Sequence, residues 1–469
     1  MDYFSYLPEA VILIIISFLP FRDAVRTSML SRRWRHYWHA ARNIDLDEKF
    51  FVRHGDSDEN IALQRMEYMH FINHWMGIFR EPEVRTFRVV FSSIAPGSAY
   101  VSDMQRCVVF AAGKCLKPIA LDLDFSSPYW DVQNLNQNPQ TIIQLPFIEA
   151  HATLESLQLS ACRFDFLQCN NFDALNNVHL GWIEVPGYTL NKFITMCPSL
   201  ETLSLKRCWN VRDMIISAQR LKVLVIDKCM EPESITVEAP LLTTFKYYGL
   251  SIYMRMDYHK NMEEAVFDYG LQSEVADEGD GEMLYNLLLE IFSVRVLTIC
   301  SYMLQVLPMC EEPLSLKPKL ENMRHLILKT QLHINEYYGI SFFLNSCPRL
   351  EILEIDLAPK RILDYGPPYG YEEHPFLIHE QHQIIYRCMK RTLKTVKVKG
   401  FKGTTDEMVV LRYLLKFGFV LESLFVDFSK EKGANDVDME ATYRGNLQRL
   451  IQLGTASPCL QVYTHHPEN

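Results

Sequence analysis

The sequence predicts a mixed α/β protein in which a short helical unit is followed by a long array of repeats whose strands run parallel. An L-x-x-L-x-L pattern that recurs from about residue 84 onward indicates the repeats. Residues that start and end helices crowd into residues 3–50 and indicate the helical unit. The composition supports a folded chain, because 48% of the 469 residues are hydrophobic and 22% are charged.

Three short helices are expected in the N-terminal unit. Pro8 can open the first helix, and Pro20 closes the apolar run of residues 10–19. Asp23 and Ser31 are suitable N-cap residues for the second and third helices. The first helix is apolar nearly all round, and two short neighbours can cover only part of it. We therefore expect another protein surface to cover the rest.

The repeat pattern begins at thirteen positions along the chain. Its starts are Val84, Leu116, Leu154, Leu175, Leu200, Leu221, Leu242, Met262, Val294, Met323, Leu350, Leu393 and Leu421. The gaps from Leu154 to Met262 are 21, 25, 21, 21 and 20 residues, within the roughly 20 to 29 residues of leucine-rich repeats. Two copies, FITMCPSLETLSL from Phe193 and FLNSCPRLEILEI from Phe343, indicate a unit of helix, turn and strand.

Such a unit cannot bury its apolar edge alone, so we expect the repeats of residues 75–373 to stack into a curved solenoid with parallel strands on its inner face. Along each strand the leucines point into the core and the residues between them point outward. The outward residues vary between repeats, which suits recognition of another protein, although solvated strand positions would give the same pattern. The candidate target contacts are Ser156, Gln158, Thr202, Ser204, Lys206, Val223, Val225, Lys246, Glu354 and Asp356.

Composition and motifs argue against several classes of function. The net charge of −10 disfavours a protein whose main surface binds nucleic acid or anionic lipid. The apolar run of residues 10–19 is about half the length that crosses a bilayer. The 12 cysteines contain no C-x-x-C pair and no catalytic motif occurs, so we expect no metal, no cofactor and no enzymatic activity. Since no signal peptide is recognisable, we expect a cytoplasmic or nuclear protein.

Residues 7–38, LPEAVILIIISFLPFRDAVRTSMLSRRWRHYW, resemble an F-box in the order and spacing of their motifs. The matching motifs include Leu7-Pro8, Ser17-Phe18-Leu19-Pro20, Asp23-Ala24-Val25, Leu30-Ser31 and Arg33-Trp34-Arg35. The chain departs from the family at Ile12 to Ile14, where polar residues are commoner, and at Phe21, where a small polar residue is usual. The resemblance implies that residues 3–50 dock the Skp-type adaptor of a cullin-RING (SCF) ubiquitin ligase, which would cover the first helix. The expected adaptor contacts are Leu7, Pro8, Ile15, Leu19, Pro20, Val25, Leu30 and Trp34.

A second resemblance covers residues 374–450, where LKTVKVKGFKGTTDEMVVLRYLLKFGFVLESLFVDF is similar to the FBD domain of plant F-box/leucine-rich-repeat proteins. The segment predicts a strand from Leu393, a turn at residues 400–403, a helix over 405–417 and a strand from Leu421. Its lysines form a second candidate site, for an acidic partner. They are Lys394, Lys397, Lys399 and Lys402.

The resemblances imply a substrate receptor that holds a ubiquitin ligase through its F-box and a target protein through its repeats or its FBD domain. Two alternatives remain open. One is an interaction scaffold without ligase function. The other is a small-molecule sensor, which would need basic residues that converge from adjacent repeats. Lys206 and Lys246 lie two repeats apart with Asp227 between them, which is a poor arrangement for binding phosphate.

Overall fold

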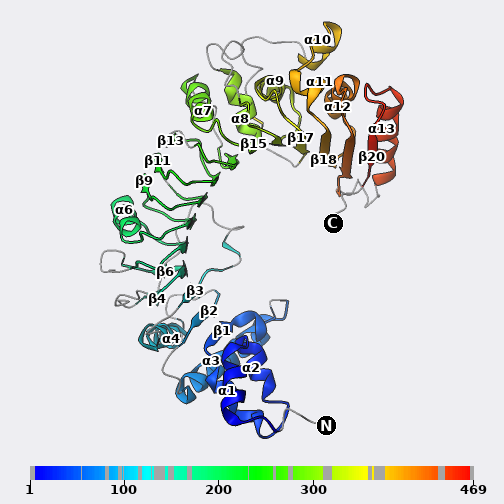
Figure 1. The fold of residues 1–469 in the computed structure, drawn as a ribbon. Coiled ribbons are helices and arrows are strands. Elements are labelled where there is room, and N and C mark those ends of the chain that lie inside the picture. The colour runs from blue at the N-terminus through cyan, green and yellow to red at the C-terminus, as the bar shows by residue number, and fades with distance from the viewer. Residues whose placement is uncertain are drawn as a thin grey trace. The chain divides into compact units, whose positions relative to one another are not determined.

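The computed structural model falls into two compact units. Unit 1 comprises residues 1–221 and 229–233, and unit 2 comprises residues 222–228 and 234–469. The residues that the structure describes are 6–53, 55–79, 84–92, 98, 100–114, 119–127, 129–130, 143–145, 153–165, 172–230, 232–256, 260–272, 278–309, 320–357, 362–363, 375–430 and 439–464. Helices and parallel strands occur in both units (Figure 1), so the predicted α/β class is confirmed.

The N-terminal helical unit contains α1 (Glu9–Phe18), α2 (Phe21–Thr27) and the 3-10 helix η2 (Trp34–Ala40). Pro8 and Pro20 occupy the N-cap positions of α1 and α2, so Pro20 separates the two helices as expected. The third predicted helix is present as a 3-10 helix.

The main strands of unit 1 are parallel and in register with one another. In order across the sheet they are β1 (Asn43–Asp47), β2 (Thr86–Val90), β3 (Ala120–Asp124), β5 (Ser156–Ser160), β7 (Asn177–Gly181) and β8 (Thr202–Lys206). The helices that accompany them are α3 (Asp58–Ile78), α4 (Tyr100–Lys114) and α6 (Gly187–Thr195). The shorter elements are η3 (Glu48–Phe50), β4 (Ile143–Gln144), β6 (Cys162–Arg163) and β9 (Asp213–Ser217).

Unit 2 repeats the same arrangement. Its main strands, in order, are β10 (Val223–Asp227), β12 (Thr244–Tyr248), β14 (Glu264–Asp268), β15 (Val296–Cys300), β16 (His325–Lys329), β17 (Ile352–Asp356), β18 (Thr395–Phe401), β19 (Ser423–Phe428) and β20 (Gln461–Tyr463). A second pair of parallel strands is formed by β11 (Ser234–Glu238) and β13 (Tyr253–Met256). The helices are α7 (Glu278–Glu290), α8 (Ser301–Val306), η5 (Leu307–Met309), η6 (Ile334–Glu336), α9 (Tyr337–Ser346), α10 (Pro375–Gln381), α11 (Arg387–Arg391), α12 (Thr405–Phe417) and α13 (Glu440–Gln452).

The leucine pattern locates the strands. Twelve of the thirteen predicted starts lie two residues before the first residue of a strand, from Val84 before β2 to Leu421 before β19. The exception is the start at Leu116, since β3 begins at Ala120, two residues later than this start predicts. Leu116 itself lies outside the described residues. A shift of two residues leaves every side chain on the same face of the strand, so periodicity cannot distinguish the two registers.

Two strands of the main sheet were not expected. β1 lies within residues 3–50, which the sequence assigns to the helical unit, and β20 lies beyond residue 450. Ala41 stands two residues before β1, where the other repeats have a large apolar residue, and this small side chain hides the repeat. The strand nevertheless buries Ile44 and Leu46 like the other repeats.

Candidate functional site

One face of the sheet in unit 1 carries the residues that the alternation predicts to point outward. We call the face that carries these outward residues, in either unit, the open face. Leu157 and Leu159 of β5 are fully buried, whereas Ser156 and Gln158 between them are half-buried. The same alternation places three further candidates of β8 on this face. They are Thr202, Ser204 and Lys206. Backbone pairing from β5 through β7 to β8 aligns Gln158, His179 and Ser204 side by side.

In unit 2 the candidates Val223, Val225, Lys246 and Asp356 are also half-buried on the open face. Lys246 forms an ion pair with Glu264, whose carboxylate lies 2.8 Å from its ammonium. Lys246 is thus engaged by β14, the neighbouring strand.

Glu354 differs from the other candidates because it is only 8% exposed. Its carboxylate lies 2.7 Å from Lys399 and 3.7 Å from the ring nitrogen of His325. These two neighbours, His325 first, lower the pKa of Glu354 to about 2 although burial acts in the opposite direction. Glu354 therefore ties β16, β17 and β18 together and offers little surface to a target.

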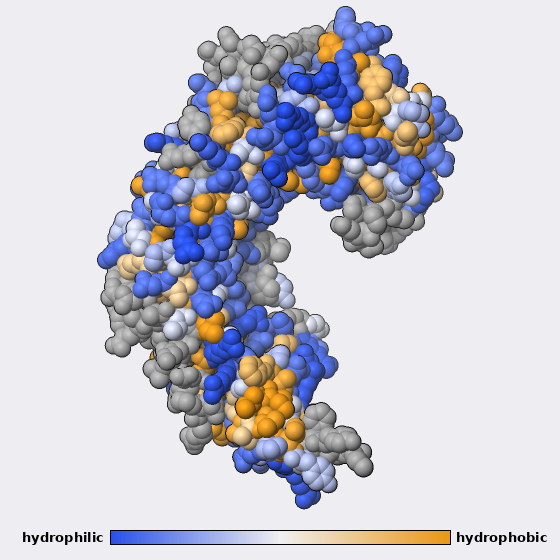
Figure 2. Space-filling view, in the orientation of Figure 1, coloured by the Kyte–Doolittle hydropathy of each residue, from blue (hydrophilic) through white to orange (hydrophobic). Residues whose placement is uncertain are grey.

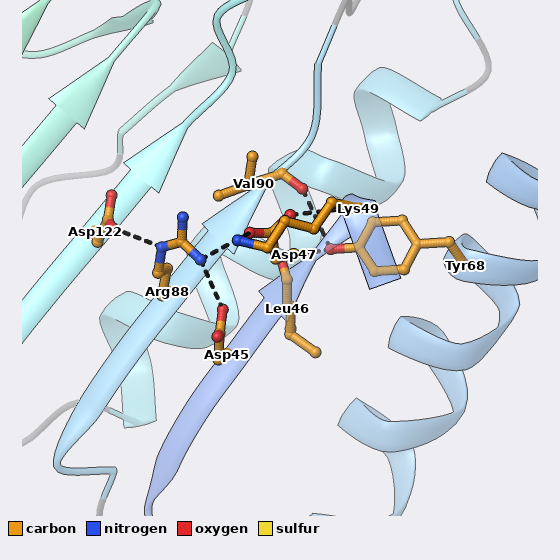
Figure 3. Close-up of polar contacts among 8 residues, drawn as sticks. All are labelled: Asp45, Leu46, Asp47, Lys49, Tyr68, Arg88, Val90 and Asp122. Atoms are coloured by element: carbon orange, nitrogen blue, oxygen red, sulfur yellow. Dashed lines mark hydrogen bonds and ion pairs between the residues drawn. The ribbon is translucent and has the colours of Figure 1, made fainter. Parts of the chain in front are cut away.

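A cluster of charges crosses the first three strands of the open face (Figure 3). Arg88 of β2 donates to Asp45 at 3.1 Å, to Asp47 at 2.8 Å and to Asp122 at 2.9 Å. Lys49 lies 2.8 Å from Asp47, which is itself almost fully buried. Burial raises the pKa of Asp122 to about 6 even though Arg88 favours its charged form. One guanidinium thus joins carboxylates from β1 and β3.

The lysines of the second candidate site are largely engaged within the fold. Lys394 pairs with Glu422 at 3.0 Å, and Lys399 pairs with Glu354. Lys397 is half-buried beside Phe425 of β19, with which it is in register. Alternation places Lys397 and Lys399 opposite the buried Val396 and Val398, as the sequence predicts.

The surface of the N-terminal helices is apolar. Figure 2 shows hydrophobic residues gathered over α1 and α2. We name five exposed side chains of this surface the docking patch. They are Val11, Ile14, Phe18, Met29 and Leu30. Phe18 is 69% exposed and Met29 86% exposed, so a substantial apolar area faces outward.

The structure distributes the predicted adaptor contacts among three environments. Pro8, Pro20 and Leu30 are exposed. Four others are half-buried: Leu7, Ile15, Leu19 and Val25. Trp34 is 3% exposed and packs inside the helical unit, where it can contribute to stability but not to direct contact.

Sequence reasoning missed four residues of the docking patch. Because α1 is apolar on every side, composition does not reveal which side faces inward. The structure buries Ile12 and Ile16, which are one helical turn apart. The outward stripe at Val11, Ile14 and Phe18 follows from that choice at helical spacing. Met29 lies in the turn after α2, where no periodicity applies.

Neither a metal site nor a transmembrane helix is found in the part of the chain that the structure describes. It contains no group of three or more His, Cys, Asp and Glu side chains placed to hold a metal ion. None of its helices is both long and apolar enough to cross a membrane.

A helical unit with an uncovered apolar patch, followed by stacked parallel-strand repeats, defines a protein made of an F-box and leucine-rich repeats. The F-box domain family matches residues 4–43, and the family described as At1g61320/AtMIF1, LRR domain, matches residues 131–451. The chain belongs to the plant F-box/leucine-rich-repeat family. Family members are generally non-catalytic adaptor proteins, and F-box domains generally bind Skp-type adaptors.

Relatives from Arabidopsis thaliana resemble this chain over most of its length. F-box protein At3g62230 is 32% identical over 94% of this chain and 93% of that protein. Putative F-box/LRR-repeat protein At5g54820 is 30% identical over 88% of both chains. F-box/FBD/LRR-repeat protein At1g78750 is 24% identical over 90% of this chain and 89% of that protein.

The repeat match includes all of residues 374–450, the segment that resembles an FBD domain. In the structure β18 pairs with β17 and β19 pairs with β18, all in parallel. The C-terminal segment therefore continues the sheet of unit 2.

Proposed function

We propose that this chain is the substrate-recognition subunit of an SCF-type ubiquitin ligase. Its F-box binds a Skp-type adaptor, and through it a cullin, while the open face of the repeats binds a target protein. The chain itself performs no chemistry. It contributes proximity, because holding target and ligase together converts a bimolecular encounter into a local one.

The docking patch is the observation that carries the adaptor half of this proposal. An apolar surface of this kind on a folded chain favours association with a partner, because water is released when it is covered. The predicted contacts Pro8, Pro20 and Leu30 are exposed, and Leu30 belongs to the patch. The predicted contacts Ile15 and Leu19 are half-buried.

Co-purification of a Skp-type adaptor with the full chain tests this half. Ile14→Asp should abolish recovery of the adaptor, because it places a charge within the covered apolar surface. Leu63→Asp on α3 is the matched control, since Leu63 is 51% exposed and Ile14 56% exposed. Full recovery with Ile14→Asp, or equal loss with Leu63→Asp, would contradict the proposal. A wild-type chain that recovers no adaptor would favour the scaffold alternative.

For the target half, we propose the open face of unit 1 around Gln158 and Ser204. These side chains are half-buried, polar and uncharged, and they lie in line on adjacent parts of one sheet. Deletion of the C-terminal segment is a poor test of this assignment, because removing β18 would turn β17 into an unpaired edge of the sheet.

Substitution is therefore the sharper test of the target site. Gln158→Arg with Ser204→Arg should reduce the set of proteins whose ubiquitination depends on this chain, with adaptor recovery unchanged. Ile215→Arg on β9 is the control, because Ile215 is exposed and β9 lies outside the main sheet. Mass spectrometry of ubiquitinated peptides provides the measurement. An unchanged set in the double variant would place target recognition elsewhere.

A further inference from the structure

The F-box is joined to the first repeat strand without a linker. The F-box match ends at residue 43, and β1 begins at Asn43. The Asn43 side chain also bridges the two parts. Its amide donates to the Ser17 carbonyl of α1 at 3.4 Å and accepts from the Thr86 hydroxyl of β2 at 3.2 Å. The end of α1 is thus held to the strands by hydrogen bonds.

Phe21 of α2 is buried at the same junction. It is 3% exposed. Its ring packs edge-on against Trp75 of α3 at 5.8 Å and against Trp38 of η2 at 6.1 Å between centroids. Phe71 of α3 lies 6.2 Å away. We name Phe21, Trp38, Phe71 and Trp75 the aromatic latch.

The aromatic latch continues into the repeats. Trp75 is fully buried, and its ring lies 6.2 Å from Phe87 of β2 and 5.3 Å from Phe110 of α4. Tyr68 of α3 ties this helix to the sheet, because its hydroxyl lies 2.5 Å from the Leu46 carbonyl of β1. An unbroken series of packed rings therefore runs from α2, through α3, to the first repeats.

We propose that Phe21 is a positioning residue that fixes the docking patch relative to the first repeat strands. The inference rests on the proposed function, because a fixed F-box would hold the adaptor in one orientation to a target bound on those strands. Close-packed aromatic rings permit few alternative arrangements, so they resist hinge motion better than a solvated loop. A small polar residue at this position would leave a gap between α2 and α3.

The same packing implies that residues 1–50 are not a complete folding unit. Without α3, the rings of Phe21 and Trp38 would lose Phe71 and Trp75 and become exposed to water. The smallest stable fragment carrying the F-box should therefore include α3 and β2.

Distance measurement between spin labels tests the positioning role in the full chain bound to a Skp-type adaptor. Nitroxide amino acids replace Arg35 in the F-box and Glu155 before β5, both exposed. The wild-type chain should give one narrow distance distribution. Phe21→Ser should broaden it or split it into two, while adaptor recovery stays at the wild-type level. In the reconstituted ligase, Phe21→Ser should also spread self-ubiquitination over more of the chain's lysines.

Phe79→Ala is the matched control. Phe79 is also 3% exposed and packs against Trp75 and Phe110, but its ring is on the repeat side of the cluster. This variant should keep the narrow distribution. If Phe21→Ser unfolds the chain, Phe21→Leu keeps an apolar contact and should still broaden the distribution.

A distribution as narrow as the wild type's in both Phe21 variants would overturn the proposal. Loss of the adaptor with an unchanged distribution would also overturn it, because Phe21 would then act in docking. This outcome differs from a failure of the proposed function. A wild-type chain that binds no adaptor can still be measured free in solution. There, a narrow distance distribution in the wild type and a broad one in Phe21→Ser would support the aromatic latch.

Discussion

Replacing Arg88 by methionine would remove the cation at the centre of the charge cluster while keeping much of the side chain's apolar length. Three carboxylates lose a partner: Asp45, Asp47 and Asp122. They differ in exposure, so the cost differs among them. The ion pair with Asp45 joins two side chains that are each more than a third exposed, and contributes about 0 to 1 kcal/mol.

The other two carboxylates decide the magnitude. Asp47 has a side chain only 3% exposed, so losing its charged hydrogen bond costs about 1.5 to 3 kcal/mol, partly offset by Lys49. Asp122 can escape part of the cost by binding a proton. We therefore expect Arg88→Met to lower the local unfolding free energy of β1 to β3 by about 2 to 4 kcal/mol at pH 8.

The pKa of Asp122 gives the sign of the pH dependence. Burial has already raised it to about 6, above the usual 3.8, so the folded state binds the proton more readily than the unfolded state. Stability from this group is present at low pH and is lost as the pH rises through 6. Removing Arg88 raises the pKa further. The cost of Arg88→Met should therefore be smaller at pH 5 than at pH 8.

Amide hydrogen exchange resolved to the peptides of β1, β2 and β3 is the appropriate assay, because long repeat arrays need not unfold in one step. Arg88→Met combined with Asp122→Asn should recover part of the loss at pH 8. A change below about 0.5 kcal/mol, or an equal loss at pH 5 and pH 8, would refute this reasoning.

Two further predictions concern unit 2. Glu354→Gln should lower the local unfolding free energy of β16 to β18, measured by amide hydrogen exchange, by about 1 to 2 kcal/mol at pH 7. The pKa of Glu354 is lowered to about 2, so its contribution to stability is present above its usual pKa of 4.5 and disappears as the pH falls toward 2. Wild type and variant should therefore converge at low pH. Gly339→Ala should destabilise α9 by about 1 to 3 kcal/mol, because an added Cβ would lie 2.1 Å from the Leu304 carbonyl oxygen. Gly445→Ala in α13, where the added Cβ meets nothing within 4 Å, should leave thermal unfolding unchanged or slightly raised, and equal effects of the two alanines would contradict the close approach.

Local spacing in the sequence predicted the secondary structure of the repeats. Leucines at fixed intervals must share one face of a strand, so the starts at Leu154 or Leu393 locate β5 and β18 without any knowledge of neighbours. The same applies to α12, whose predicted bounds of 405–417 are those observed. β1 was not predicted because Ala41 stands where a large apolar residue, most often leucine, precedes the other strands.

Only the tertiary structure decided which side of α1 is exposed, that Glu354 is enclosed by His325 and Lys399, and that Phe21 is buried. Each outcome depends on residues that are distant in the chain. Phe21 packs against Trp75 of α3, and the pairing of β17 with β18 brings Glu354 next to Lys399. A local pattern fixes the direction of a side chain relative to its own strand or helix. Whether that direction leads to water or to another side chain depends on the elements that pack against it.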